Sequence, residues 1–218
     1  PSELPILILG PSGTGKTNLA RVIHDYSGRA GAFVAINCSA YTEDLLEAEL
    51  FGYKKGAFTG ANDGHKGKLL AADQGTLFLD EIGSMSLKMQ TKLLKAIEER
   101  SFYPLGSDRA ETSRFRVISA TLEDVQSLIK AGKMRFDFFQ RIHGLSVELK
   151  ALARRKGDVL PLIAALGRGG KRLSFTPEAK QRLLGHDWPG NVREVKRFVE
   201  LLAAGVRGVL PADTDGDS

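Results

Sequence analysis

Cysteine is nearly absent from this 218-residue chain, which contains only Cys38. A single thiol forms no internal disulfide, so a disulfide-stapled exported scaffold is excluded. Long apolar runs are also missing: Leu4–Leu9, interrupted by Pro5, is far shorter than the roughly 20 residues that a membrane span needs. We find no charged leader followed by an apolar segment and a small-residue cleavage site. The sequence therefore predicts a cytoplasmic protein without a membrane partner.

The chain has only a small excess of positive charge, and this excess is unevenly distributed along the sequence. The formal net charge is +5 at pH 7, yet the first 149 residues hold 18 basic and 18 acidic side chains. Residues 150–218 hold 13 basic and 8 acidic side chains, so the whole excess lies there. With 42% hydrophobic and 26% charged residues, the composition is that of a globular protein with a core. The asymmetry separates a neutral two-thirds from a basic third, and the basic third admits a polyanionic partner.

Short apolar runs alternate with helical patterns in the neutral two-thirds. The predicted strands are Leu4–Leu9, Phe33–Ile36, Leu77–Leu79 and Phe115–Ala120, and the predicted helices are Lys16–Tyr26, Leu45–Leu50 and Leu87–Arg100. The glycine-rich stretch Gly52–Gly67 has little periodicity. Strands alternating with helices predict an α/β domain with a parallel sheet covered on both faces.

From about Lys150 the pattern is helical only. Predicted helices run over Val159–Leu166 after Asp158, from Pro177 after Thr176 to about Leu184, and from Asn191 to about Val206. We therefore expect an α/β domain at residues 1–150 and a small all-α domain at residues 151–210. The Asp- and Gly-rich tail at residues 211–218 is expected to be disordered.

Residues 10–17 fit the phosphate-loop pattern of Gly, four residues, Gly, Lys and Ser or Thr. In that motif glycines let backbone N–H groups converge on phosphate oxygens, while Lys16 reaches the β and γ phosphates and Thr17 binds Mg²⁺. A glycine-rich turn without a ligand is the alternative, but the flanking strand and helix favour a site for ATP and Mg²⁺. The predicted phosphate-binding residues are Gly10, Pro11, Ser12, Gly13, Thr14, Gly15, Lys16 and Thr17.

Two adjacent carboxylates, Asp80 and Glu81, follow the apolar run Leu77–Leu79. The carboxyl end of a parallel strand is where such sheets bind ligands. We expect Asp80 to hold Mg²⁺, directly or through water, and Glu81 to orient and polarise the attacking water. Alone, such a pair is more often a solvated turn; its combination with the phosphate loop favours catalysis.

The hexapeptide Gly56–Ala61 is similar to the signature of the bacterial enhancer-binding proteins, the AAA+ ATPases that activate sigma-54 RNA polymerase. Further segments resemble the same family in the same order: Phe33–Cys38, Glu49–Gly52, Gly75–Gly83 and Trp188–Glu194. The resemblance covers nearly the whole chain. It implies a P-loop AAA+ three-layer sandwich followed by an all-α lid. It also implies a hexameric or heptameric homo-oligomer ring that hydrolyses ATP and remodels closed promoter complexes.

In this family the hexapeptide tips a surface loop, here within residues 52–67, that grips the sigma factor. An exposed Phe58 suits a contact anchor, and Gly56 and Gly60 let the loop move. The residues alone leave open a Phe58 that fills the protein's own core. The partner-binding residues implied by the resemblance are Gly56, Ala57, Phe58, Thr59, Gly60 and Ala61.

Four further residues receive roles from the resemblance alone. Arg135 and Arg141 resemble two arginines that neutralise charge on the γ phosphate of a neighbouring subunit. Arg193 resembles the second sensor, which reaches the nucleotide from the lid, and Asn37 resembles the switch asparagine that holds Glu81 in one nucleotide state. Surface salt bridges for the arginines and a backbone-satisfied Asn37 are the alternatives.

Several positions depart from the family. Ala120-Thr121-Leu122 stands where the first sensor has Ala-Thr-Asn, and leucine neither donates nor accepts a hydrogen bond. Leu69-Leu70 replaces a Phe-Glu pair that transmits the nucleotide state to the loop. Few residues precede Gly10, where the family has an adenine-lining segment. The phosphate loop is therefore expected to be intact, while the sensing residues are altered.

We therefore predict an ATPase module that remodels sigma-54 polymerase complexes. A second hypothesis is a nucleotide-binding module that hydrolyses poorly because Leu122 and Leu70 replace polar sensors. A third, an AAA+ motor acting on nucleic acid, is disfavoured by the hexapeptide and by the neutral first two-thirds. DNA is expected to bind only through a domain absent from this chain, because no helix-turn-helix follows the last predicted helix.

Overall fold

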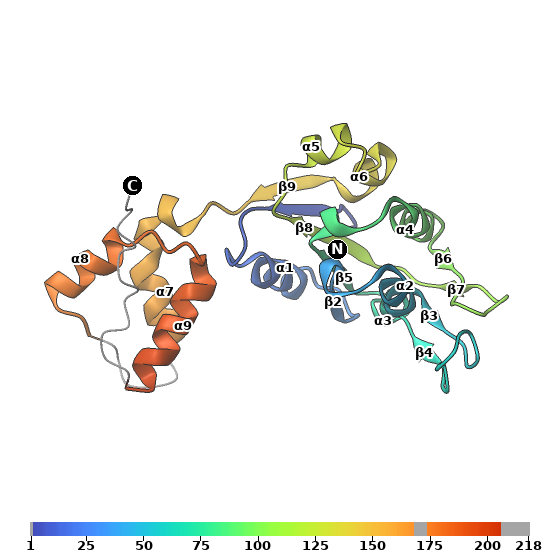
Figure 1. Cartoon of the computed structure of the whole chain (residues 1–218), viewed down its shortest axis with the longest axis horizontal. Helices are drawn as coiled ribbons and strands as arrows, with labels where there is room; N and C mark the ends of the chain where they lie inside the picture. The colour runs from blue at the N-terminus through green and yellow to red at the C-terminus, as the bar shows by residue number, and fades with distance from the viewer. Residues whose placement is uncertain (1, 168–173, 206–218) are drawn as a thin grey trace. The chain divides into compact units, whose positions relative to one another are not determined.

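The computed structural model describes residues 2–167 and 174–205, which form two compact units (Figure 1). The N-terminal unit holds the residues up to Leu9 and Lys16–Glu148, and the C-terminal unit holds Gly10–Gly15 and the residues from Leu149 onward. The predicted division near residue 150 did not anticipate that Gly10–Gly15 groups with the C-terminal helices. None of the described helices is long and apolar enough to cross a membrane.

Among the described residues, the N-terminal unit is built on a five-stranded parallel sheet with the order β2-β5-β8-β1-β9. Its strands are β1 (Ile6–Leu9), β2 (Phe33–Asn37), β5 (Thr76–Asp80), β8 (Arg116–Thr121) and β9 (Leu145–Glu148). The four predicted strands are confirmed. Strand β9 was not predicted, because three of its four residues are exposed and it forms no buried apolar run. Asn37 pairs with Asp80, so the ends of β2 and β5 lie side by side.

The two faces of the sheet bury alternate side chains, as the period of two along a strand requires. Leu7, Leu77 and Leu79 belong to a large core cluster that also contains residues of α2 (Glu43–Phe51), α4 (Leu87–Glu99), α5 (Val125–Lys130) and α6 (Phe136–Ile142). The buried residues that alternate with these along the strands lie outside that cluster, on the other face of the sheet. They are Ile6, Ile8, Phe78, Ile118 and Ala120.

Helix α1 (Lys16–Asp25) covers the second face. Its His24 ring lies 5.6 Å from that of Phe33, which stacks on Phe78, and His24 Nδ1 lies 2.9 Å from Thr76 Oγ1. The result is a three-layer α/β sandwich, as predicted. The predicted helices are confirmed, while α3 (Lys68–Ala71), α5 and α6 were missed because helices this short show too little periodicity.

Two short antiparallel ribbons extend from the same end of the N-terminal unit (Figure 1). One pairs β3 (Gly52–Tyr53) with β4 (His65–Lys66), and the other pairs β6 (Ser101–Phe102) with β7 (Glu111–Thr112). Leu105 joins them, because its N–H donates to Gly52 O at 2.9 Å and its carbonyl accepts from Lys54 N at 2.9 Å. The stretch that lacked periodicity is thus a ribbon that carries the hexapeptide at its tip.

The described part of the C-terminal unit is helical: η3 (Leu152–Arg154), η4 (Lys156–Asp158), α7 (Val159–Leu166), α8 (Pro177–Gly185) and α9 (Asn191–Ala203). Trp188 is its fully buried centre, and its indole N–H donates to Leu183 O at 3.0 Å. Thr176 caps α8 by accepting from Ala179 N at 3.2 Å. Asp158, expected to cap α7, makes no capping bond and contacts Arg155 instead. The tail at residues 211–218 lies outside the described residues.

Candidate active site

The carboxyl end of β5 and the start of α1 bring Lys16, Thr17 and Asp80 together. The Thr17 side chain hydrogen-bonds the Asp80 carboxylate, and the Lys16 charge acts on the same group. Burial is the larger effect and raises the pKa of Asp80, the nearby Glu81 charge raises it further, and Lys16 and Thr17 oppose the shift. Lys16 and the nearby hydrogen bonds therefore do not fully offset the cost of burying the negative charge of Asp80.

These oxygen donors fit Mg²⁺. The ion usually binds one or two carboxylates together with substrate phosphates, rather than a complete protein cage. Asp80 supplies the carboxylate and Thr17 the hydroxyl, and a cation would relieve the repulsion between Asp80 and Glu81. The described residues accordingly contain no cluster of three His, Cys, Asp or Glu side chains able to enclose a metal alone.

Glu81 has an unusual backbone, because its φ of +56° lies in the left-handed region that non-glycine residues rarely adopt. Such strain concentrates at functional sites. The Glu81 carboxylate accepts a hydrogen bond from the Ser39 hydroxyl, and that hydroxyl also lies 2.9 Å from Asn37 Oδ1. Among the described residues, no hydrogen bond links Asn37 directly to Glu81. Ser39, which sequence reasoning missed, stands between the two predicted site residues.

Residues Gly10–Gly15 are held within the C-terminal unit by three side chains. Asn191 Nδ2 donates to Ser12 O at 2.9 Å, an Arg155 guanidinium nitrogen donates to Thr14 O at 3.0 Å, and Arg193 donates to Ser12 Oγ at 3.3 Å. Asn191 is 3% exposed, and its Oδ1 accepts from the Leu152 N–H at 2.7 Å. The loop is therefore held by side chains of the C-terminal unit through two of its carbonyls and the Ser12 hydroxyl.

Glycine is required at Gly13 of this loop. Its φ is +76°, and a Cβ there would collide with the Gly190 carbonyl. Arg193 was predicted for this region, whereas Asn191 was predicted only as a helix start and Arg155 was not predicted. Nothing in the sequence around Arg155 distinguishes it from the other basic residues nearby.

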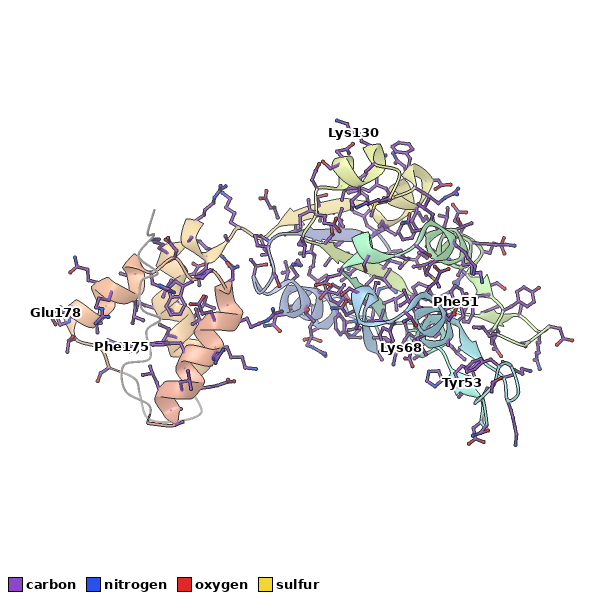
Figure 2. All side chains as sticks on the ribbon, viewed as in Figure 1. Phe51, Tyr53, Lys68, Lys130, Phe175 and Glu178 are labelled. Carbon is purple, nitrogen blue, oxygen red and sulfur yellow. The ribbon has the colours of Figure 1, made fainter. Side chains whose placement is uncertain are left out.

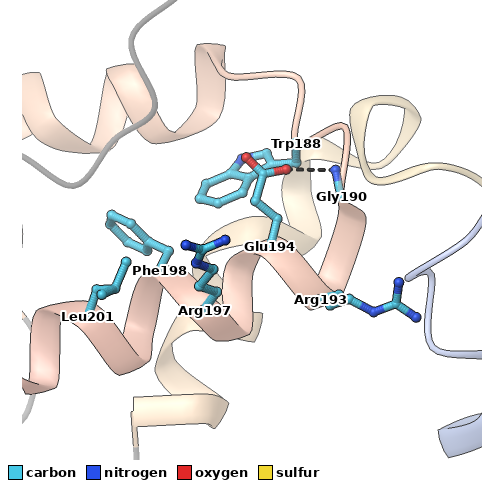
Figure 3. A pocket seen from close by; sticks show the side chains of 7 residues that line it. All are labelled: Trp188, Gly190, Arg193, Glu194, Arg197, Phe198 and Leu201. Carbon is cyan, nitrogen blue, oxygen red and sulfur yellow. Dashed lines mark hydrogen bonds between the residues drawn. The ribbon is translucent and has the colours of Figure 1, made fainter.

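Helix α9 carries a hollow of about 560 Å³ along one side, within the C-terminal unit (Figure 3). It is lined by Trp188, Gly190, Arg193, Glu194, Arg197, Phe198 and Leu201. Glu194 accepts a hydrogen bond from Gly190 N at 2.7 Å and lies 2.8 Å from His186 Nε2. Figure 3 shows that the Arg193 side chain extends away from Arg197, toward the loop that contains Ser12.

The hexapeptide forms a tight surface turn at the tip of the β3–β4 ribbon, near Tyr53 (Figure 2). Gly56 N donates to Ala61 O at 2.8 Å, and Ala61 N donates to Phe58 O at 3.0 Å. Phe58 is 43% exposed and contacts the Tyr53 ring edge-on, with 4.9 Å between the centroids. Phe58 therefore lies at the surface rather than in the core.

Arg135 and Arg141 are both exposed at the ends of α6. Arg135 pairs with Asp137 through two contacts, of 3.0 Å and 2.6 Å, which raise the pKa of Arg135 and lower that of Asp137. Arg141 donates a 3.4 Å hydrogen bond to Ile97 O. Among the described residues, no ion pair connects either arginine to Asp80 or Glu81 of the same chain.

The departures from the family pattern are visible at the first-sensor position. Thr121 is buried, and its hydroxyl accepts from Glu123 N at 3.0 Å. Leu122 is 55% exposed and offers no polar atom. Leu69 is fully buried in the large core cluster. The end of β8 therefore offers the Thr121 hydroxyl and, at Leu122, no polar side-chain atom.

Cys38 lies buried beside the acidic pair, and burial, with smaller contributions from Asp80 and Glu81, raises its thiol pKa to about 12. Relative to an ordinary thiol of pKa 9.0, the thiolate fraction at pH 8 falls about 1000-fold. We expect a maleimide to label Cys38 at least about 100-fold more slowly in the folded chain than in urea. Labelling at equal rates in both conditions would contradict this environment.

Three features define an AAA+ nucleotide-binding module with a helical lid. They are the order of the parallel sheet, the strand–loop–helix passage at residues 6–25 and the acidic pair at the end of β5, the strand next to β2. Residues 1–148 match the family described as "Sigma-54 interaction domain", and residues 153–210 match the "AAA+ ATPase lid domain". The chain therefore belongs to the sigma-54 interaction domain family, the AAA+ domain of sigma-54-dependent transcriptional regulators.

Individual relatives agree with this assignment. The chain is 45% identical to the transcriptional regulatory protein ZraR of Escherichia coli over 92% of its length and 47% of ZraR. It is 44% identical to the sigma54-dependent transcriptional regulator SfnR of Pseudomonas fluorescens over 91% of its length and 56% of SfnR. The chain thus spans about half the length of these curated relatives.

Solved structures show the same fold. NtrX from Brucella abortus in complex with ADP superposes with a TM-score of 0.85 at 34% identity, covering 98% of this chain and 48% of NtrX. NtrX in complex with ATP gives the same values. Adenine nucleotides are therefore bound by a structurally similar relative.

Proposed function

We propose that this chain is the ATP-hydrolysing motor of a sigma-54-dependent activator, and that it remodels closed promoter complexes of sigma-54 polymerase in the cytoplasm. The observation that carries the proposal is that Thr17, Asp80, Glu81 and Lys16 lie close together at the end of β5. The proposed reaction is attack of water on the γ phosphate of ATP. In such reactions positioning and charge stabilisation provide most of the catalysis.

Each residue has a role in this proposal. The loop Gly10–Thr17 binds the phosphates through backbone N–H groups and the Lys16 ammonium. Thr17 and Asp80 hold Mg²⁺, which neutralises phosphate charge when bound. Glu81 accepts a hydrogen bond from the attacking water and orients it.

Other subunits and the lid complete the proposed site. Arg135 and Arg141 of one subunit stabilise charge on the γ phosphate held by its neighbour, so activity requires a homo-oligomeric ring. Arg193, which already contacts Ser12 in the phosphate loop, contributes a further cation toward the nucleotide. These arginines are unable to lose their charge at neutral pH, which suits them to this role.

A second candidate is a module that binds ATP and sigma-54 but hydrolyses slowly. The exposed Leu122 favours it, because the first-sensor position lacks an amide that would contact the γ phosphate or the water. The two candidates share the nucleotide and the partner and differ only in turnover, so a direct rate measurement separates them.

The contact with sigma-54 is tested with Thr59→Ala. We expect wild type to capture purified sigma-54 in the presence of an ATP transition-state analogue, and Thr59→Ala to lose this capture while still binding nucleotide. The control is Thr91→Ala, which changes an exposed threonine on α4 far along the chain from the hexapeptide. Capture by Thr59→Ala at the wild-type level would remove the hexapeptide from the interface.

A further inference from the structure

Ser39 connects the two residues expected to switch hydrolysis. It lies in η1 (Cys38–Ala40), the short helical turn that follows β2. Its N–H donates to Asn37 Oδ1 at 2.9 Å, and its hydroxyl lies 2.9 Å from the same oxygen and within hydrogen-bonding distance of Glu81 Oε2. The backbone N–H fixes the orientation of the Asn37 amide, because only the oxygen accepts a hydrogen bond.

The Ser39 hydroxyl therefore faces two acceptors with one proton. A carboxylate oxygen is a stronger acceptor than an amide oxygen, so the Ser39 hydroxyl donates its hydrogen bond to Glu81. Asn37 Oδ1 and a carboxylate oxygen both accept hydrogen bonds, so they do not bond each other directly, whereas the Ser39 hydroxyl lies within hydrogen-bonding distance of both.

We propose that Ser39 is a positioning residue that orients the Glu81 carboxylate for catalysis, and that Asn37 acts on Glu81 through Ser39. This inference rests on the proposed ATPase function. One carboxylate oxygen is held by Ser39, which leaves the other oxygen to orient the attacking water.

The first test is Ser39→Ala. Because Ser39 is exposed, its truncation leaves the core intact. We expect kcat for ATP to fall about 10-fold, within the range of a hydrogen bond to a charged group. KM should stay unchanged, because Lys16 and the loop bind the phosphates. Ser39→Thr keeps the hydroxyl and should restore kcat.

Ser84→Ala is the matched control. Ser84 is an exposed serine that donates to the Glu81 backbone carbonyl at 2.7 Å and does not contact the carboxylate. Its loss should leave kcat near the wild-type value. A Ser39→Ala rate equal to or above wild type, or an equal fall in Ser84→Ala, overturns the positioning role.

A double-mutant cycle tests the route from Asn37. If Asn37 acts through Ser39, Asn37→Ala combined with Ser39→Ala lowers kcat no further than Ser39→Ala alone. Independent contacts would instead multiply the two losses and overturn the route. The proposed function fails separately, and this inference with it, if wild-type turnover does not exceed that of Glu81→Gln.

Discussion

Glu81→Gln is expected to lower ATP turnover at least about 100-fold and to leave ATP binding unchanged, because a neutral amide does not accept a proton from water or orient it as a carboxylate does. The substitution preserves volume and hydrogen-bonding reach at the end of β5. Turnover is measured as phosphate release and binding as displacement of a fluorescent ATP analogue. Glu98→Gln, an exposed glutamate on α4, is the matched control and should match wild type in both assays.

Two outcomes would contradict the assignment of Glu81. Turnover in Glu81→Gln close to wild type would exclude it from the reaction. Loss of nucleotide binding together with turnover would place it in the binding of phosphates or Mg²⁺ rather than in the activation of water. Wild-type turnover as low as that of the variant, with binding retained, would favour the module that hydrolyses poorly.

Arg135→Ala and Arg141→Ala are each expected to lower turnover about 1000-fold or more, the range found for arginines supplied in trans. Both side chains are exposed and so are accessible to a neighbouring subunit, on which we propose that they act. Arg135 must also leave its pair with Asp137, which is solvent-exposed and therefore inexpensive to break. Arg109→Ala, another exposed arginine of the N-terminal unit, should have no effect.

Mixed assemblies distinguish trans action from cis action. Glu81→Gln subunits retain both arginines, and Arg135→Ala subunits retain Glu81. Mixing two inactive variants should restore part of the turnover, because interfaces form in which Glu81 from one variant meets Arg135 from the other. The absence of any recovery, in mixtures shown by mass to contain both subunits, would contradict shared sites.

Much of the fold could be predicted from the sequence. Strands β1, β2 and β5 carry short apolar runs, β8 is rich in apolar residues, and α1 and α4 are long enough to show helical periodicity. Strand β9 could not be predicted, because most of its side chains are exposed and its place is set by pairing with β1. The β3–β4 ribbon was missed because two-residue strands carry no pattern.

The candidate site, like the fold, could be predicted only in part from the sequence. Lys16, Thr17 and Asp80 are grouped by motif and strand position, and the structure brings them together. Ser39 and Arg155 could not be predicted, because their contacts depend on the turn after β2 and on the packing of Gly10–Gly15 against the C-terminal helices. Tertiary neighbours of this kind leave no local signal in the sequence.

The central claim, an ATPase whose sites are completed by neighbouring subunits, is tested most directly by phosphate release per subunit as a function of protein concentration. The account predicts a specific rate that rises with concentration as rings assemble, and a Glu81→Gln rate that stays at background throughout. A wild-type rate per subunit that is independent of concentration would contradict the shared site. A rate indistinguishable from that of Glu81→Gln at every concentration would contradict the hydrolysis itself.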